Sequence, residues 1–294
     1  MKRSKMRYCG REFTASQIDW IRRLSASSGL NRAQLSRLVC RRLGWYKPDG
    51  GLKEMSCRVA MLRMQDDGLL ALPAPLGGNG NGKRYSRRTA AAEPGSPRTC
   101  RVDQLSGLRL ELVTGQRHSQ LWNEYVDRYH YLGFAPLPGA QLRYFACADD
   151  QHLALLGFGA AAWKILPRDR WIGWSHPQRE QRLHLLVNNA RFLILPWIEC
   201  ANLASKLLGM VARRLADDWQ ASYGYRPVLL ETFVESGRFA GTSYRSANWI
   251  HVGRTQGRGK LDRHHTRAVP PKEIWLYPLR KDFRNILRTV TSQK

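Results

Sequence analysis

The chain has 294 residues, 43% of them hydrophobic, which is enough to bury the core of one large or two ordinary domains. Its 48 Lys and Arg residues outnumber 23 Asp and Glu residues, and the net charge of +25 indicates a polyanionic partner, nucleic acid ahead of a membrane surface. Because no run of about 18 uncharged apolar residues and no signal-peptide core occur, we expect a cytoplasmic protein with no membrane partner.

The first predicted unit is a small helical domain over residues 1–74. Apolar Ile18, Ile21 and Leu24 mark one helix, and a second opens after Asn31 and stops at Gly44. A third helix and the apolar run "LLALPAP", which suits a short strand, complete the pattern. Three helices and a strand predict a winged-helix-like nucleic-acid-binding domain.

The third predicted helix begins near Leu52, ends at Gly68 and is the expected recognition helix. Its inner face is predicted to carry Met55, Val59 and Leu62. The side chains expected on the opposite, groove-facing side are Lys53, Ser56 and Arg63. An ordinary helical domain with a solvated basic face would show the same pattern.

A basic linker rich in Gly and Pro is predicted over residues 75–104. Its first part, "PLGGNGNGKRYSRRTAAAEPGSP" (75–97), holds few apolar residues and cannot order itself by burial. It is either a linker or an arm that orders on nucleic acid through residues such as Lys83 and Arg84.

From residue 105 to the C-terminus, strand and helix patterns alternate. A strand, a helix closed by Gly133, a hairpin around Asp149 and Asp150, and the buried strand "NNARFLIL" come first. A long amphipathic helix follows, marked by Leu203, Leu207, Leu208, Val211, Leu215 and Trp219. The strand "RPVLLETFV", an aromatic segment and a last strand "WIHVGRT" complete the domain. We therefore expect an α+β protein overall.

This order of elements resembles the GNAT acyltransferase fold, so the second domain is predicted to be a GNAT-like mixed sheet with a basic C-terminal segment. In that family a Gly-rich loop before the long helix holds the pyrophosphate of acetyl-CoA. Here the corresponding residues, "PWIECANLAS" (196–205), contain no glycine. The cofactor is therefore unknown, although the helix N-terminus can hold an anion.

Four stretches resemble the Druantia A family of the Druantia anti-phage systems: "YHYLG" (129–133), "NNARFLILP" (188–196), "LLETFVE" (229–235) and "YRSANWIHVGRTQGRGK" (244–260). The resemblance covers about residues 10–280. It implies a bacterial protein in a defence or mobile-element setting, with other proteins of that setting as partners. A pair of neighbouring residues, His130 and Tyr131, is also similar to the His-Tyr pair of phage Mom-type DNA modifiers, which are GNAT-like.

Four residues are catalytic candidates: His130, Tyr131, Glu231 and Tyr244. His130 and Tyr131 can act as base and proton donor, or can be a solvated ring and a core ring. Glu231 is flanked by apolar residues and needs a partner such as Arg245 or Arg191, so it is a general base, a metal ligand or half of a buried ion pair. In GNAT enzymes a tyrosine placed like Tyr244 can be the general acid.

The stretch "TSYRSANWIHVGRTQGRGKLDRHH" (242–265) joins aromatic residues to a glycine-punctuated basic run. Its aromatic part is expected to stack on a base or pack in the core, and its basic part to clamp phosphates. The nucleic-acid-binding candidates here are Arg245, Asn248, Trp249, Arg254, Arg258, Lys260 and Arg263. No metal site is predicted, because His264 and His265 are adjacent and six dispersed cysteines form no CxxC pair and are expected to be reduced thiols.

The function expected from the sequence is DNA binding in anti-phage defence or a mobile element, with a GNAT-like domain that modifies bases. A first alternative is a non-catalytic DNA-recognition subunit of a defence complex. A second is a strand-cleaving or strand-transferring enzyme in which Tyr131 or Tyr244 attacks a phosphodiester. Whether the protein is an enzyme at all stays open at this point.

Overall fold

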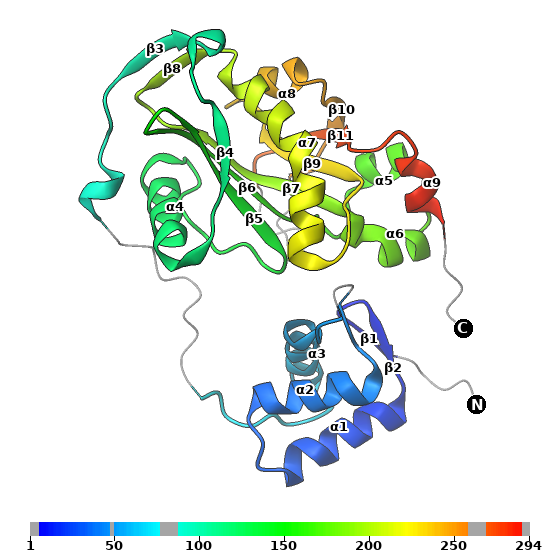
Figure 1. Ribbon diagram of the computed structural model, residues 1–294. Coiled ribbons are helices and arrows are strands. Elements are labelled where there is room, and N and C mark those ends of the chain that lie inside the picture. The colour runs from blue at the N-terminus through cyan, green and yellow to red at the C-terminus, as the bar shows by residue number, and fades with distance from the viewer. Residues whose placement is uncertain (1–5, 48–49, 77–87, 258–268, 290–294) are drawn as a thin grey trace. The chain divides into compact units, whose positions relative to one another are not determined.

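The structure is a computed structural model that describes residues 6–47, 50–76, 88–257 and 269–289. The chain divides into two compact units, Met1–Lys83 and Arg84–Lys294 (Figure 1). The first unit is mostly helical and the second contains a large mixed sheet. The predicted α+β class is therefore confirmed.

The first unit opens with an antiparallel hairpin and continues with three helices. Its elements are β1 (Met6–Tyr8), β2 (Arg11–Phe13), α1 (Ala15–Ser27), α2 (Arg32–Leu43) and α3 (Glu54–Asp66). Capping boxes at Thr14 and Asn31 satisfy the first amides of α1 and α2, and Gly44, with a φ of 61°, ends α2 in the left-handed conformation. The three predicted helices are present.

Two details of the first unit differ from the sequence prediction. The predicted inner face of α3 is wrong, because Met55 and Val59 are 64% and 37% exposed, whereas Cys57, Met61 and Met64 are buried. The apolar residues of this helix are distributed over more than one side, so the sequence pattern alone did not identify the buried side. The strand predicted at 69–75 is also wrong. That stretch is not a strand, since Pro73 and Pro75 cannot donate to a ladder, and the hairpin instead precedes α1.

The second unit is built on a seven-stranded sheet. In sheet order its strands are β10 (Ile250–Arg254), β11 (Lys272–Pro278), β9 (Leu229–Glu235), β7 (Leu186–Ile194), β6 (Gln151–Ala160), β5 (Gln141–Ala148) and β4 (Arg109–Leu112). All neighbours are antiparallel except β7 and β9, which α7 (Leu203–Tyr223) connects in parallel. The predicted GNAT-like order is present, and β11, which the prediction lacked, lies between β9 and β10.

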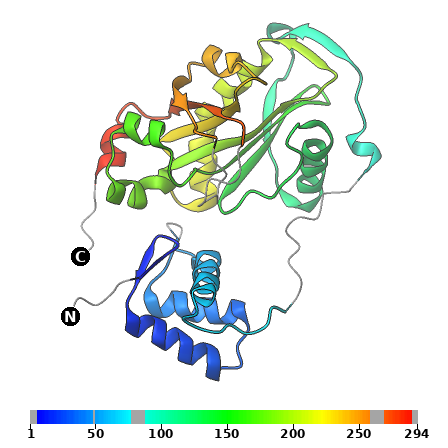
Figure 2. The ribbon, with the colours of Figure 1, turned by 180° about the vertical axis from the view of Figure 1, so that it is seen from behind.

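Helices cover both faces of this sheet. Tyr144 of β5 donates a hydrogen bond to Asp218 of α7, whereas its neighbours Arg143 and Phe145 contact α4 (Gly115–Tyr129). Because neighbouring strand residues point to opposite faces, α4 and α7 lie on opposite sides of the sheet. The remaining helices are α5 (Leu166–Ile172), α6 (His176–Arg182), α8 (Thr242–Ser246) and α9 (Phe283–Arg288). Figures 1 and 2 show α5, α6 and α9 grouped at the end of the sheet away from α4.

Residues 88–104, which lie in the predicted linker, belong to the second unit. They form two 3-10 turns, Ala90–Ala92 and Val102–Gln104, and the strand β3 (Arg98–Arg101), which pairs in parallel with β8 (Ile198–Ala201). Tyr125 and Tyr129 of α4 donate hydrogen bonds to the first turn. These residues are ordered by contacts with β8 and α4, which are distant in the sequence, and composition alone does not predict such contacts. All six cysteines are free; Cys40, Cys57 and Cys147 are buried and the other three are half-buried.

Candidate functional site

The two parallel strands at the centre of the sheet separate soon after they pair. Leu186–Asn188 of β7 are in register with Leu229–Glu231 of β9, but β7 continues to Ile194 and β9 to Glu235. The pairing of β7 with β6 also shifts register next to Gly157, where Arg191 is its partner. Arg191 therefore lies on the part of β7 that has left β9, and two predicted site residues, His130 and Tyr131, lie near it.

His130 follows the last residue of α4, and its imidazole is a neutral hydrogen-bond donor. Its side chain is largely buried and stacks on Tyr131, with 4.8 Å between ring centroids. Burial, and then the nearby Arg191, lowers the pKa of His130 to about 4. Nδ1 accepts a hydrogen bond from the Leu132 amide at 3.2 Å, so the proton of the neutral ring is on Nε2. At neutral pH this ring can donate, and it acts as a base only after a change of tautomer.

Tyr131 stands beside His130 and is also a proton donor at neutral pH. The Arg238 guanidinium lies 4.7 Å from its ring centroid, and Phe239 contacts the ring edge-on. Burial and then the charge of Glu235 raise the pKa of Tyr131, and Arg191 and Arg238 oppose them. A phenol that stays protonated is a poor nucleophile without a base, so this environment does not favour strand cleavage by Tyr131.

Tyr244 of α8 is buried, and its hydroxyl donates to Asn189 Oδ1 at 2.8 Å. Burial raises its pKa to about 12, and Tyr131 adds to this shift, so the structure brings the two tyrosines within electrostatic range. Trp249 packs on Tyr244 with 5.1 Å between ring centroids and is only 4% exposed. The indole of Trp249 is thus a core aromatic, and the expectation that it stacks on a base does not fit its burial.

Glu231, the fourth catalytic candidate, is held in a buried ion pair away from the other three. Its Oε2 accepts a hydrogen bond from Arg168 Nη1 at 2.7 Å, its Oε1 accepts one from the Ala162 amide at 2.7 Å, and both charged side chains are fully buried. The partner is therefore Arg168 rather than Arg245 or Arg191. The next residue on the strand, Thr232, donates a hydrogen bond to the Tyr244 hydroxyl at 3.4 Å, so Glu231 points to the face of the sheet opposite Tyr244.

Arg168 is also paired with Asp169, which contacts Arg179 at 3.4 Å. Two arginines and two carboxylates thus form one buried network that holds α5 and α6 to β9. This arrangement corresponds to the ion-pair interpretation of Glu231 among the alternatives that the sequence left open.

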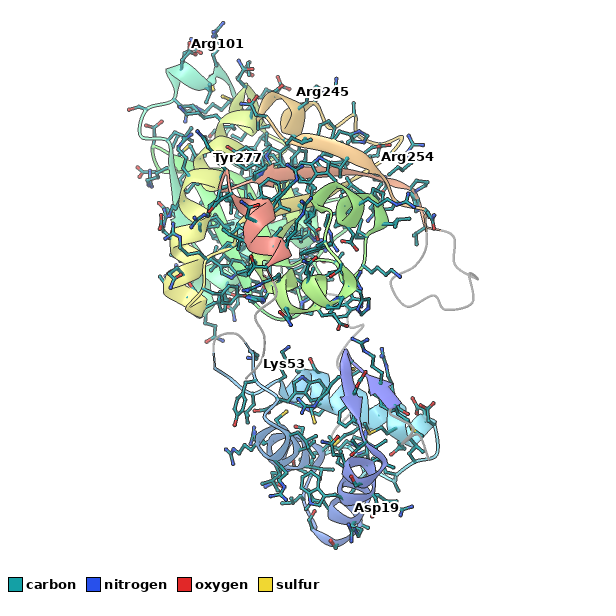
Figure 3. The ribbon with its side chains drawn as sticks, turned by 90° about the vertical axis from the view of Figure 1, so that its right-hand side faces the viewer. Asp19, Lys53, Arg101, Arg245, Arg254 and Tyr277 are labelled. Carbon is teal, nitrogen blue, oxygen red and sulfur yellow. The ribbon has the colours of Figure 1, made fainter. Side chains whose placement is uncertain are left out.

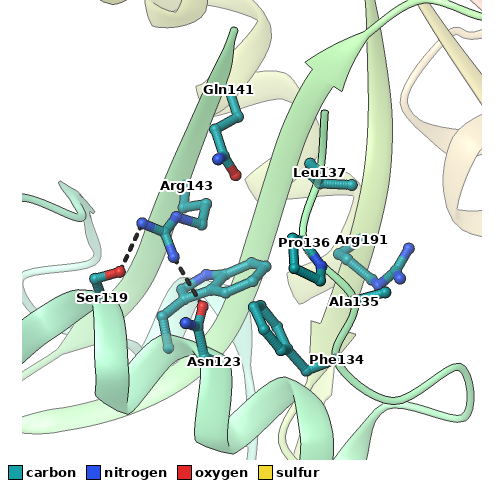
Figure 4. A pocket seen from close by; sticks show the side chains of 10 residues that line it. Ser119, Asn123, Phe134, Ala135, Pro136, Leu137, Gln141, Arg143 and Arg191 are labelled. Atoms are coloured by element: carbon teal, nitrogen blue, oxygen red, sulfur yellow. Dashed lines mark hydrogen bonds between the residues drawn. The ribbon is translucent and has the colours of Figure 1, made fainter. Parts of the chain in front are cut away.

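Arg191 is also one of the residues that line a pocket of about 180 Å³ (Figure 4). Its lining residues come from α4, the segment before β5, β5 and β7: Ser119, Trp122, Asn123, Phe134, Ala135, Pro136, Leu137, Gln141, Arg143 and Arg191. Apart from Arg191, none of them was singled out by the sequence analysis. They are too dispersed along the chain for a motif, and an arginine in a strand gives no sign that it faces a cavity.

The nucleic-acid-binding candidates occupy varied environments. Arg245 and Asn248 are exposed, while Arg254 donates to Glu273 at 2.7 Å and is exposed on the same unit (Figure 3). On the first unit, Lys53 precedes α3 and its ammonium has a pKa lowered by burial; Ser56 and Arg63 on α3 are half-buried. The candidates outside the described residues are Lys83, Arg84, Arg258, Lys260 and Arg263.

The described residues contain no group of three or more His, Cys, Asp or Glu side chains that could hold a metal ion. His264 and His265 lie outside these residues. Within the same part of the chain, no helix is both long enough and apolar enough to cross a membrane.

The stability of the protein should depend on the titration of His130. In the unfolded chain this histidine binds a proton below pH 6.5, its ordinary pKa, whereas the folded protein does so only near pH 4. The unfolded state thus binds more protons in this window, and folding loses up to about 3 kcal/mol as the pH falls through it. Urea denaturation between pH 7 and 4 measures this as the difference between wild type and His130→Gln. His118→Gln, on the exposed part of the same helix, is the control, and equal pH dependence in wild type and His130→Gln would contradict the assignment.

A family model described as Druantia protein DruA matches residues 67–271, which is more than half of the chain. Among curated proteins, none matches the chain significantly.

Solved acetyltransferases are similar to part of this chain at low sequence identity. A Bacillus subtilis acetyltransferase in complex with CoA is 9% identical, covers 58% of this chain and 98% of its own, and has a TM-score of 0.33. The ribosomal-protein-S18-alanine N-acetyltransferase of Escherichia coli is 8% identical, with coverage of 63% and 99% and a TM-score of 0.35. The spermidine/spermine N-acetyltransferase SpeG of Vibrio cholerae, in complex with manganese ions, is 8% identical, with 60% and 96% covered and a TM-score of 0.37.

Proposed function

Because the chain belongs to the Druantia protein DruA family of anti-phage systems, we propose that it binds DNA during defence against phage. The observation that carries this proposal is the charge excess. With 48 basic and 23 acidic residues, 25 cationic side chains would remain even if every acidic side chain were paired with a basic one. DNA phosphates are the abundant polyanion that such a surface would meet in an infected cell.

The first unit supports the proposal through α2 rather than through the helix expected from the sequence. This helix carries Arg32, Arg37, Arg41 and Arg42 and no acidic residue. Arg37 forms an ion pair with Glu54. Arg41 and Arg42 are exposed, and neither forms an ion pair with a carboxylate in the described part of the chain. The exposed side of α3 is partly apolar, so α2 is the better candidate for a helix that faces DNA, whether or not the unit is a winged helix.

The direct test is equilibrium binding of the full-length protein to fluorescently labelled duplex and single-stranded DNA at 50 mM salt, with no other protein present. We expect saturable binding to at least one form. Failure to bind either form at this low ionic strength would refute the proposal, because electrostatic attraction to phosphates is strongest there.

A second candidate function, an action on a nucleobase by the GNAT-like domain, is favoured by the closeness of His130 and Tyr131 to Arg191 and of Tyr244 to Tyr131. At neutral pH His130 and Tyr131 are proton donors beside this cation, which suits the stabilisation of developing negative charge. Mass spectrometry of nucleosides from incubated DNA tests it. Modified nucleosides that disappear in Tyr131→Phe would support this function, and DNA left unmodified in the presence of the remaining defence proteins would count against it.

A further inference from the structure

Trp163, at the bend between β6 and α5, is the most exposed tryptophan of the protein. All ten tryptophans lie within the described residues, and Trp163 is 51% exposed, whereas six of the others are buried and three are half-buried. Indole rings are usually well covered, because each presents a large apolar surface. The fold therefore leaves one large aromatic ring accessible to a ligand.

This ring is supported on its inner side and open on its outer side. The guanidinium of Arg179, a residue only 5% exposed, lies 5.8 Å from the ring centroid. Because Arg179 is in the interior, it covers the inner face, and the exposed surface of Trp163 belongs to the outer face. The backbone just before the ring is also fixed. The Ala162 amide donates to Glu231 and the Ala162 carbonyl accepts from Arg168, both at 2.7 Å. The ring is thus held in place before any ligand binds.

The exposed charges next to the ring are positive. In residues 161–175 the two exposed charged side chains are Lys164 and Arg170. The one acidic side chain of this stretch, Asp169, is buried in the ion-pair network of α5 and α6. Neither Lys164 nor Arg170 forms an ion pair with a carboxylate in the described part of the chain. The charge of this surface is therefore complementary to a polyanion.

The surface continues from the bend along α5, which lies at the end of the sheet away from α4 (Figure 1). Leu166, 46% exposed, and Arg170 are four residues apart on this helix and are therefore neighbours on one of its faces. An open aromatic ring beside cations is the combination that binds single-stranded nucleic acid, because bases stack on the ring and phosphates meet the cations. A duplex keeps the faces of its bases inside the stack, so a paired base cannot cover the ring.

We propose that Trp163 stacks on a base of single-stranded DNA, and that Lys164 and Arg170 contact phosphates of the same strand. This inference rests on the proposed DNA-binding function and specifies the form of DNA that the second unit holds. Stacking on an indole needs only the flat face of a base, so binding at this surface tolerates any sequence.

The test is fluorescence anisotropy of the full-length protein with a labelled single strand and with a duplex of the same length. Trp163→Ala should weaken single-strand binding by about five- to hundredfold, the loss of one stacked base, and change duplex binding by less than about twofold. Trp163→Phe keeps an aromatic face and should lose less. Leu166→Ala is the matched control, because it removes exposed apolar surface beside the ring but no ring, and it should leave both affinities unchanged.

Two further measurements do not depend on the folding of the Trp163 variants. Arg170→Gln, a change at an exposed side chain, should reduce the slope of log affinity against log salt for the single strand by about 0.7. An unchanged slope contradicts the phosphate contact. The wild-type protein should also bind a strand of abasic sites more weakly than a normal strand, and equal affinity for the two overturns base stacking.

The outcomes separate this inference from the proposed function. If the protein binds DNA and folded Trp163→Ala binds single strands as wild type does, the stacking proposal is wrong and the proposed function stands. Equal losses in Trp163→Ala and Leu166→Ala would identify a general apolar contact and also overturn it. If Trp163 is needed for an RNA strand but not for DNA of the same sequence, the surface belongs to RNA and the proposal fails. A protein that binds no DNA in either form refutes the proposed function itself.

Discussion

Glu231→Gln is expected to lower the free energy of unfolding by about 3–5 kcal/mol, the usual effect of removing one partner of a buried ion pair. The amide keeps the shape of the side chain but removes the charge that faces Arg168 at 2.7 Å, and both side chains are fully buried. Asp169 still contacts Arg168, yet it is shared with Arg179 and cannot replace two charge-assisted bonds. The remaining guanidinium would stay in the core with too little negative charge around it.

Urea denaturation followed by tryptophan fluorescence measures this effect, and the chain offers a matched control. Glu235 lies four residues further along the same strand and contacts Arg238 at 3.6 Å with half of that arginine exposed. Glu235→Gln should cost less than about 1 kcal/mol, as for other exposed pairs. A Glu231→Gln protein as stable as wild type but inactive in phage defence would contradict the structural role and return Glu231 to the catalytic candidates.

Glu231 illustrates which features of a buried site can be predicted from the sequence and which cannot. A carboxylate between apolar residues on a strand already required a buried partner, and that inference is correct. Its partner was not deducible, because Arg168 lies 63 residues earlier in a short helix whose packing depends on β9, β11 and α9. Arg245 and Arg191, the two partners expected from the sequence, lie closer to Glu231 along the chain. In the structure, however, Arg245 is exposed and Arg191 lines a pocket.

Periodicity predicted the elements better than their faces. The amphipathic pattern of α7 had one apolar stripe and was correctly predicted, with Leu207, Leu208 and Val211 buried. In α3, Met55 and Val59 competed with Cys57 and Met61 for the inner position, and only the tertiary contacts with α1 and α2 decide between them. The pocket could not be predicted for the same reason. Arg143 is positioned by hydrogen bonds to Ser119 and Asn123, which lie on a helix that contacts its strand only in the folded protein.

The affinity of the protein for DNA should fall steeply with salt. A protein that contacts about six to ten phosphates loses roughly 10³–10⁵ in affinity between 50 and 200 mM salt, because each contact releases a condensed counterion. An excess of 25 cationic side chains can supply this number of contacts. Fluorescence anisotropy across this salt range measures the slope, and a change of less than about threefold would remove the electrostatic basis of the proposed function.

Two exposed arginines of the second unit, Arg245 and Arg254, let the same measurement distinguish phosphate contacts from net charge (Figure 3). Arg254 forms an ion pair with Glu273. Burial alone would raise the pKa of Glu273, but hydrogen bonds from Ser236, His251 and Arg254 outweigh it and lower this pKa to about 2. Arg245, in contrast, forms no ion pair with a carboxylate in the described part of the chain. Arg245→Gln and Arg254→Gln remove the same charge from the protein. If Arg245 contacts a phosphate, its replacement reduces the slope of log affinity against log salt by about 1, and the Arg254 variant changes it less because Arg254 is already paired. Equal slopes in the two variants would show that net charge, rather than a contact made by Arg245, sets the affinity.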